Sequence, residues 1–251
     1  MKTIVVTQAR SNSTRLPNKV LMKIQDKTLL QIHLDRIKQA KSVSEVIIAT
    51  TINKIDDVIV DLANNLKVEV YRGSENDVLD RFYKAVMDKK PDFVVRLTSD
   101  CPLIDPQLLD EMIDTAKQKN LDYYSNILHE RYPDGQDIEI FTFKALETAW
   151  KKAELNSDRE HVTPFIRINS SFNGGELFTS ANHNLKEDYS QVRLTVDEPK
   201  DFEVMELIIG NLGLEKDWKA YADYYLENED IKKINGSIVR NEGYLKSLKE
   251  D

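Results

Sequence analysis

The sequence predicts an α/β fold with a mostly parallel sheet that helices cover on both faces. In the first part of the chain, short runs rich in Val, Ile and Thr alternate with longer amphipathic segments, an order typical of βαβ units. The length of 251 residues is sufficient to bury a core without disulfide bonds. Because no internal repeat, low-complexity tract or linker interrupts the chain, we expect a single domain over residues 1–251.

The first four strands and helices follow from periodicity and helix-start signals. Four short β-branched runs are predicted strands, namely Thr3–Gln8, Val46–Thr51, Val68–Tyr71 and Phe93–Thr98. Apolar residues at helical spacing predict three helices between them, at Leu29–Lys38, Ile55–Asn65 and from Val78 to Val86. A fourth helix is expected to begin at Pro106, because proline suits the first turn and Asp105 is a suitable N-cap.

The second half of the chain is less regular. We expect strands at Asp137–Phe141, Leu177–Thr179 and Gln191–Val196, helices at Thr142–Glu154 and Pro199–Leu212, and surface loops at Asn169–Gly175 and Ser180–Tyr189. The region 123–178 exceeds what closing the sheet requires, so we predict an insertion there that serves as a substrate lid or a dimer arm. Residues beyond Leu212 carry no motif that indicates a role.

Composition and charge exclude several classes of protein. The formal net charge of −8 would repel a nucleic-acid backbone, so no nucleic-acid partner is expected. No apolar run approaches the roughly 20 residues that a membrane-spanning helix needs, so no membrane partner is expected either. A single cysteine permits no internal disulfide, and this suits a reducing compartment. We therefore predict a cytoplasmic protein.

The segment after the first strand is the strongest local signal. Between Gln8 and Lys19 it places Arg10, Arg15 and Lys19 among small polar residues. Ligands of open α/β sheets bind beyond the carboxyl ends of the strands, where these cations can converge on a polyphosphate. The glycine spacing of a P-loop or a dinucleotide fingerprint is absent. The alternative is a solvated basic loop with surface ion pairs.

Two carboxylates follow other predicted strands and are candidate metal ligands. Asp100 comes after Phe93–Thr98, and Asp197 comes after Gln191–Val196. Together they can hold Mg²⁺ against phosphate oxygens. The alternative for Asp100 is capping of a turn. Glu198 and Asp201 suit the start of the following helix.

Other polar residues suggest a place for a second substrate. Asp137 and Glu139 stand two apart on a predicted strand, so both should project from one face, toward sugar hydroxyls or toward solvent. Arg159 and His161 lie in a charged cluster before an apolar helix. The spacing of His33, His129, His161, His183 and Cys101 supports neither a zinc site nor a Cys–His pair. Cys101 is expected to be a small buried residue.

Several ordered motifs carry a family resemblance. The stretch Gln8–Lys19 resembles the nucleotide-binding signature of CMP-sugar synthetases, which include CMP-Kdo synthetase and the acylneuraminate cytidylyltransferases. The best match is the cytidylyltransferase family named for spore-coat polysaccharide biosynthesis. Its other motifs correspond, in the same order, to Gly73–Phe82, Arg96–Pro106, Gly135–Phe141, Arg159–Pro164 and Thr195–Phe202. The resemblance spans about residues 1–210, and the combination is more specific than any single motif.

The resemblance implies a three-layer α/β/α sandwich like that of nucleotide-diphospho-sugar transferases, usually dimeric, which uses CTP and Mg²⁺. It implies nucleotide contacts from Gln8, Ala9, Arg10, Ser13, Arg15, Lys19, Arg96, Thr98 and Ser99. It implies catalytic roles for Arg10, Arg15, Lys19 and Asp100, metal ligation by Asp100 and Asp197, and substrate binding by Asp137, Glu139, Arg159 and His161. Position 99 is Ser where Gly is common in related enzymes, so the backbone approach to the nucleotide is expected to differ slightly there.

The implied reaction is a displacement in which an oxygen of an acidic sugar attacks the α-phosphorus of CTP and pyrophosphate leaves. No dedicated general base is evident. One alternative is a nucleotidyltransferase with another nucleotide or with a non-sugar acceptor, such as a phosphonate or a polyol phosphate. A second is a catalytically silent nucleotide-binding protein. A third is a glycosyltransferase, although Asp137-Ile138-Glu139 only loosely imitates its metal motif.

Overall fold

A seven-stranded sheet forms the centre of the protein. The computed structural model describes residues 1–248 and Asp251. The strands are β1 (Thr3–Gln8), β4 (Glu45–Thr51), β5 (Glu69–Gly73), β6 (Phe93–Thr98), β7 (Tyr123–Ser125), β8 (Glu139–Thr142) and β9 (Ser180–Asn182). Their order is β5-β4-β1-β6-β8-β7-β9. Only β8 runs antiparallel to its neighbours, β6 and β7, so the predicted mostly parallel sheet is confirmed for the described residues.

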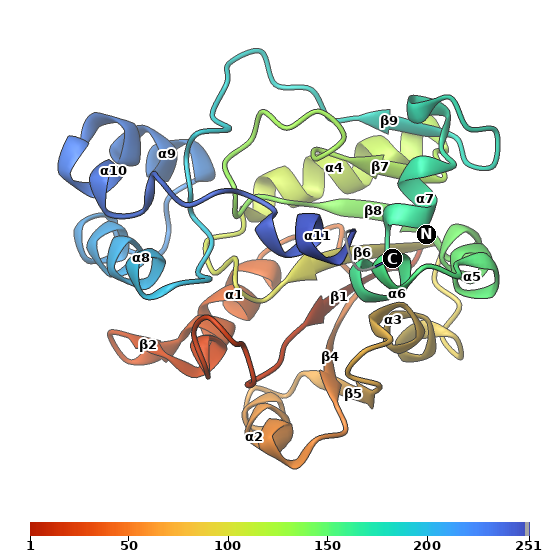
Figure 1. The fold of residues 1–251 in the computed structure, drawn as a ribbon, viewed down its shortest axis with the longest axis horizontal. Helices are drawn as coiled ribbons and strands as arrows, with labels where there is room; N and C mark the ends of the chain where they lie inside the picture. The colour runs from red at the N-terminus through yellow and green to blue at the C-terminus, as the bar shows by residue number, and fades with distance from the viewer. Residues whose placement is uncertain (249–250) are drawn as a thin grey trace.

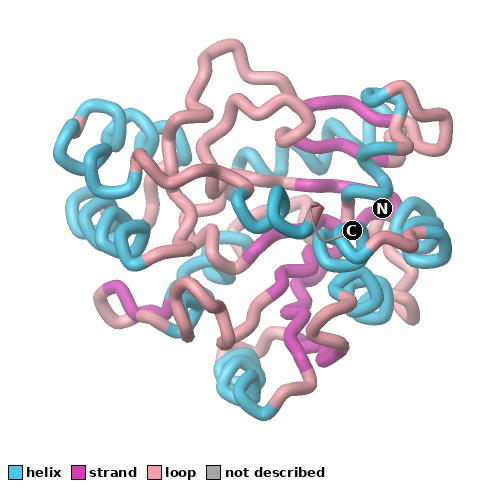
Figure 2. Tube along the Cα trace, in the orientation of Figure 1, coloured by secondary structure: helices cyan, strands magenta, loops and turns pink. Residues whose placement is uncertain are grey.

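Helices cover both faces of this sheet, as Figures 1 and 2 show. One face carries α1 (Leu29–Ile37), α2 (Asp57–Asn65) and α4 (Pro106–Lys119), and the other carries α3 (Val78–Val86), α5 (Phe143–Lys152), α6 (Asn156–His161) and α7 (Pro164–Ile168). Alternation along β1 explains the two layers, because Ile4 and Val6 pack with the α3 side while Val5 packs with α4. The expected three-layer α/β/α sandwich is therefore confirmed.

The C-terminal part adds helices at one end of the sandwich. Helices α8 (Pro199–Leu212), α9 (Trp218–Glu227) and α10 (Glu229–Asn235) share an apolar cluster with α1. The chain then crosses to α11 (Glu242–Ser247), which contacts α6 (Figure 1). Short elements complete the fold: η1 (Lys19–Leu21), β2 (Lys23–Ile24), β3 (Lys27–Thr28), η2 (Lys54–Asp56) and η3 (Ser171–Asn173). Within the described residues, no helix has the length and apolarity needed to cross a membrane.

Two predicted strands are wrong. Gln191–Val196 is extended but makes only an isolated bridge between Asp134 and Arg193. Its alternation arises because Val192, Leu194 and Val196 pack against the α8 and α9 helices rather than within the sheet. The strand expected at Leu177–Thr179 lies further along the chain as β9, inside a segment that we expected to be a loop. Three residues of β7 are too few to show a period of two, and this strand was not predicted.

Local signals in the sequence account for other details. Asp105 caps α4, accepting hydrogen bonds from the backbone N–H groups of Gln107 and Leu108 at 2.8 and 2.9 Å, as expected. Asp137 lies before β8 rather than on it, so the expectation that it shares a strand with Glu139 is wrong. Strands β7 and β8, which belong to region 123–178, are part of the central sheet.

Candidate active site

A cavity of about 780 Å³ lies beyond the carboxyl ends of β1 and β6. Eight of the nine expected nucleotide-binding residues line it, namely Gln8, Ala9, Arg10, Ser13, Arg15, Lys19, Thr98 and Ser99. The ninth, Arg96, lines an adjoining cavity instead. The position agrees with the rule that ligands of open α/β sheets bind at this edge.

The loop between Gln8 and Lys19 is held in place by buried polar contacts. The backbone N–H of Ser11 donates to Oδ1 of the fully buried Asp56 at 2.7 Å. Asn18 adopts a left-handed conformation, with φ of 59°, and its N–H donates to the Ser11 carbonyl at 2.8 Å. The Ser99 hydroxyl donates to the Gln8 carbonyl at 2.7 Å. The loop is therefore anchored at both ends and in the middle, unlike a freely solvated basic loop.

Asp100 and Asp197 meet at Lys19. The Lys19 ammonium donates to Oδ2 of Asp100 at 2.8 Å and to Oδ1 of Asp197 at 2.7 Å. Burial opposes the charged form of both Lys19 and Asp100. Their mutual attraction outweighs it, so the pKa of Lys19 is raised and that of Asp100 lies below its usual range. Asp100 thus keeps its negative charge, and the two carboxylates already accommodate one cation.

Asp197 reaches this place through a backbone contact rather than a strand end. The N–H of Val196 donates to the carbonyl of Asp100 at 2.8 Å, which sets the two acidic residues side by side. Asp201 accepts the backbone N–H of Asp197 and that of Glu198, each at 3.0 Å, and completes a capping box at the start of α8. The expected helix-start roles of Glu198 and Asp201 are therefore confirmed.

Arg193 organises the carboxylates behind this pair. Its guanidinium donates to Asp201 at 2.8 and 2.9 Å, to Asp134 at 2.7 Å and to Asp197 at 3.4 Å. Burial lowers the pKa of Arg193, but these carboxylates raise it by a larger amount. The pKa therefore lies above its usual range, and the guanidinium stays charged. Arg193 was not identified from the sequence, because it lies inside the segment that was expected to be a strand.

The large cavity is lined by five cationic side chains and by five carboxylates, with Arg10, Arg15, Lys19, Arg81 and Arg159 as the cations. Arg10 lies 3.8 Å from Glu75, Arg15 lies 3.0 Å from Asp197, and Arg159 lies 2.5 Å from Asp77. Burial and the like charge of Arg10 lower the pKa of Arg81 to about 10. A polyanionic ligand can take the place of these carboxylate partners at the guanidinium and ammonium groups.

A second cavity, of about 240 Å³, adjoins the first. Arg15, Thr98, Asp100, His161 and Asp197 line both cavities, so the two meet at the carboxylate pair. Of the expected substrate-binding residues, Asp137, Glu139 and His161 line the smaller cavity, whereas Arg159 lines only the larger one. Cys101 is buried, as expected, in the wall of the smaller cavity.

The smaller cavity has a charged floor. Glu139 accepts hydrogen bonds from Arg96 at 2.6 Å and from the Tyr123 hydroxyl at 2.5 Å. Burial raises the pKa of Glu139, but Arg96 and Arg167 lower it below its usual range. Arg167 also lines this cavity and was not identified from the sequence, because its helix α7 showed only an apolar pattern.

The residues present fit a magnesium ion. Within the described part of the chain, no group of three or more His, Cys, Asp or Glu side chains could hold a metal. Mg²⁺ is commonly held by one or two carboxylates together with substrate phosphates and water. Asp100 and Asp197 supply two carboxylates, and the Lys19 ammonium between them marks a place suited to a cation.

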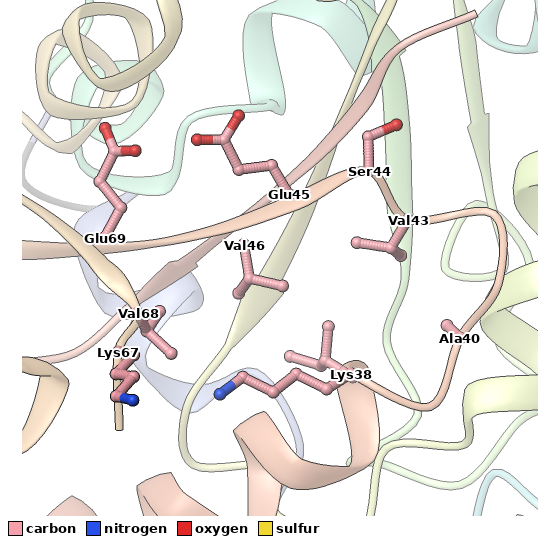
Figure 3. Close-up of a pocket in the computed structure, with 10 residues that line it drawn as sticks. Lys38, Ala40, Val43, Ser44, Glu45, Val46, Lys67, Val68 and Glu69 are labelled. Carbon is pink, nitrogen blue, oxygen red and sulfur yellow. The ribbon is translucent and has the colours of Figure 1, made fainter. Parts of the chain in front are cut away.

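A further cavity lies at the opposite edge of the sheet. It has a volume of about 420 Å³ and lies where β4 and β5 begin, near Glu45 and Glu69 (Figure 3). Its Lys38 ammonium donates to the backbone carbonyl of Leu66 at 3.0 Å. None of the residues expected to bind a ligand lines it, and ligands of parallel sheets bind at the other edge.

Two carboxylates join two cavities at the carboxyl edge of a mostly parallel sheet, an arrangement that suits a nucleotidyltransferase. The family model described as Cytidylyltransferase matches residues 4–231. The chain therefore belongs to the cytidylyltransferase family, as the sequence motifs indicated. This result supports the enzyme prediction over the glycosyltransferase and the catalytically silent alternatives.

The chain resembles proteins from several organisms. It is 42% identical to an uncharacterised protein of Methanocaldococcus jannaschii over 247 residues, which cover 97% of this chain and 98% of the relative. It is 33% identical to a spore coat polysaccharide biosynthesis protein of Bacillus subtilis over 227 residues, 86% and 90% of the two chains.

Solved structures agree with this assignment. A cytidylyltransferase from Leptospira borgpetersenii superposes with a TM-score of 0.85 at 34% identity, covering 92% of this chain and 96% of that one. A CMP:2-keto-3-deoxy-manno-octonic acid synthetase complexed with CTP superposes with a TM-score of 0.61 at 17% identity, covering 84% and 99%. The second match shows the shared fold.

Proposed function

We propose that this protein transfers a cytidylyl group from CTP to an acidic sugar, such as a nonulosonic or Kdo-like acid, and releases pyrophosphate. The observation that carries the proposal is the meeting of two cavities at Asp100 and Asp197. The larger cavity has room and cations for a nucleoside triphosphate, and the smaller one has room and polar groups for an acceptor. Their junction is where the two substrates must react.

The nucleotide would lie along the loop between Gln8 and Lys19. Arg10, Arg15 and Lys19 would neutralise the phosphates, and the backbone near Ala9 would read the cytosine edge. Mg²⁺, held by Asp100 and Asp197 with phosphate oxygens, would supply charge neutralisation at the polyphosphate. The remaining catalysis is positioning together with stabilisation of the negative charge that develops on phosphate oxygens.

The reaction is a single displacement. An oxygen of the acceptor forms a bond to the α-phosphorus of CTP, and the bond from that phosphorus to the bridging oxygen of pyrophosphate breaks. The proton of the acceptor passes to solvent or to a nearby carboxylate. No described residue is assigned as a dedicated general base.

Two guanidinium groups in the smaller cavity support an acidic acceptor, although six acidic side chains line this cavity against three arginines. Arg96 and Arg167 line it, and His161 stands at its junction with the nucleotide cavity. Guanidinium groups suit a carboxylate, and the carboxylates Asp137 and Glu139 suit sugar hydroxyls. The names of the Bacillus relative and of the octonic acid synthetase support a role in surface polysaccharide or glycan synthesis. A phosphonate or a polyol phosphate would meet the same arginines and is the second candidate.

A pyrophosphate-release assay tests this proposal. Each of the four nucleoside triphosphates is combined with Mg²⁺ and a panel of nonulosonic acids, Kdo-like acids, phosphonates and polyol phosphates. We expect turnover with CTP and a sugar acid. Calorimetric titration of each nucleotide alone should show preference for CTP, because a pocket that reads a pyrimidine leaves polar groups unpaired against a purine. Tighter binding of ATP would overturn the cytidine assignment.

We also propose a homodimer formed through region 123–178. Ile168, Phe172 and Leu177 in this region are 58%, 46% and 42% exposed, and such apolar side chains suit a symmetric interface. Light scattering should give twice the chain mass of 29.0 kDa at micromolar concentration. A monomer with full activity would contradict the proposal. A cytoplasmic location stays a prediction that rests on the single cysteine.

A further inference from the structure

The C-terminal segment lies across the smaller cavity, far from the helices that precede it in the chain. After α10 the chain returns to α6, and Val239, Asn241, Glu242 and Tyr244 line the smaller cavity (Figure 1). The family model ends at residue 231. The lining therefore combines residues from the stretch that the family model matches with residues that follow it.

Ion pairs and hydrogen bonds hold this segment in place. Arg240 donates to Oδ1 of Asp137 at 2.5 Å and to the carbonyl of Tyr132 at 3.2 Å. Asn241 donates to Glu130 at 2.8 Å. The side chain of Arg240 is 14% exposed, so its pair with Asp137 is shielded from water. These contacts fix the segment to the loop that precedes β8.

Tyr244 sits among the polar groups expected to meet the acceptor. Its ring lies edge-on to the His161 ring, with centroids 5.0 Å apart. The Arg167 guanidinium carbon lies 5.0 Å from the centre of the same ring. An aromatic face can both orient a guanidinium and pack against the C–H groups of a sugar ring. Tyr244 therefore contacts two residues of the cavity that come from separate helices.

We propose that residues Val239 to Tyr244 form a wall of the acceptor cavity and that Tyr244 determines which acceptor the enzyme binds. This inference rests on the proposed function for the identity of the acceptor. The nucleotide cavity is built largely from the part of the chain that matches the family. The acceptor cavity gains a wall from residues that follow this stretch.

The test uses the full chain and three variants. Tyr244→Ala removes the ring, Tyr244→Phe keeps it, and Leu248→Ala changes an exposed residue at the end of the same segment that lines neither cavity. For Tyr244→Ala we expect the KM for the acceptor to rise about fivefold to tenfold, with relaxed preference among acids of different size. The dissociation constant for CTP, measured by calorimetry without acceptor, should change less than about twofold. Tyr244→Phe and Leu248→Ala should resemble the original protein.

The single cysteine provides a second readout that needs no acceptor. Cys101 lines the same cavity and is 5% exposed. Opening the wall should increase the rate at which a methanethiosulfonate reagent modifies it. We expect faster modification in Tyr244→Ala and in Arg240→Ala, which removes the anchor, and an unchanged rate in Leu248→Ala.

The outcomes separate this inference from the proposed function. If both Tyr244→Ala and Arg240→Ala left the acceptor KM and the rate of Cys101 modification unchanged, the proposal that this segment forms a wall of the acceptor cavity would be wrong. If Tyr244→Ala weakened CTP binding by the same factor as it raised the acceptor KM, Tyr244 would belong to the nucleotide site. Its proposed role in acceptor selection would then be wrong. If the original protein binds CTP but consumes no acid, the proposed acceptor class fails, and the modification rates alone then decide whether the wall exists.

Discussion

The ammonium nitrogen of Lys19 lies 2.8 Å from Oδ2 of Asp100 and 2.7 Å from Oδ1 of Asp197, residues 81 and 178 positions away in the chain. Three separate segments thus converge on one point between the two cavities. Lys19 offsets part of the negative charge of the two carboxylates. In the proposed function, binding of a polyphosphate with a metal ion would free the ammonium to turn to a phosphate oxygen.

Asp100→Asn or Asp197→Asn should abolish most turnover while leaving the fold intact. Each change keeps the shape but removes a charge that the candidate metal site needs. Because both carboxylates would serve one ion, the double variant should be little worse than either single variant. Turnover measured against magnesium concentration checks this, with the almost fully exposed Asp230→Asn as control. A capping role alone would instead cost about 1 kcal/mol of stability and leave activity and magnesium dependence near normal.

Replacing Lys19 by Met should have opposite effects on two ligands. Loss of a charge-assisted phosphate contact should weaken CTP binding by about 1.5–3 kcal/mol, or roughly 10- to 150-fold. Free Mn²⁺ should bind more tightly without nucleotide, because the ammonium no longer competes for Asp100 and Asp197. Calorimetry with each ligand measures both effects, and the exposed Lys23→Met is the matched control. CTP affinity equal to that of the control would contradict the phosphate role of Lys19.

Arg15→Ala should also weaken CTP binding without opening a core cavity. Its guanidinium lies 3.0 Å from Asp197, and its side chain is 36% exposed and lines both cavities. The expected loss is again about 1.5–3 kcal/mol, with unchanged thermal stability. Kinetics that match the original protein across a range of salt concentrations would show that this arginine faces solvent only.

Two Gly→Ala substitutions should shift stability in opposite directions. Gly135 has φ of +112°, and a Cβ there would lie 2.6 Å from the Leu194 backbone, so Gly135→Ala should destabilise by several kcal/mol. A Cβ at Gly210, inside α8, would meet no atom within 4 Å. Gly210→Ala should therefore stabilise by about 0.5–1 kcal/mol. Urea unfolding measures both, and equal effects at the two positions would refute the close approach at Gly135.

Stability should fall in acid partly through His33. Its ring lies fully buried between the Thr7 hydroxyl at 3.0 Å and the Cys101 carbonyl at 2.8 Å, and burial lowers its pKa to about 4 from 6.5. Because the folded pKa is lower, this contribution is complete above about pH 6.5 and is lost as pH falls toward 4. The full loss is on the order of 3 kcal/mol. His33→Gln should flatten the change in unfolding free energy between pH 7 and pH 5.

Much of the fold could be predicted because its signals are local. The β-branched run at β1, the helical spacing in α3 and the Asp105–Pro106 start of α4 each act within a few residues, and all three are confirmed. The loop between Gln8 and Lys19 was expected at the correct edge because parallel strands bring their carboxyl ends together. The prediction of a strand at Gln191–Val196 is wrong because apolar and polar residues alternate in the same way in a strand and in an extended segment that packs against helices.

The sequence by itself determined the layered fold, the family and the cationic loop, since periodicity and ordered motifs are readable within short stretches. Only the tertiary structure decided which distant charges meet. Arg193 gathers Asp134, Asp197 and Asp201, and Tyr244 comes to lie against His161 and Arg167. Such contacts depend on how separate elements pack, and a buried charge can be paired by any partner that packing brings near. No local pattern in the chain specifies that choice.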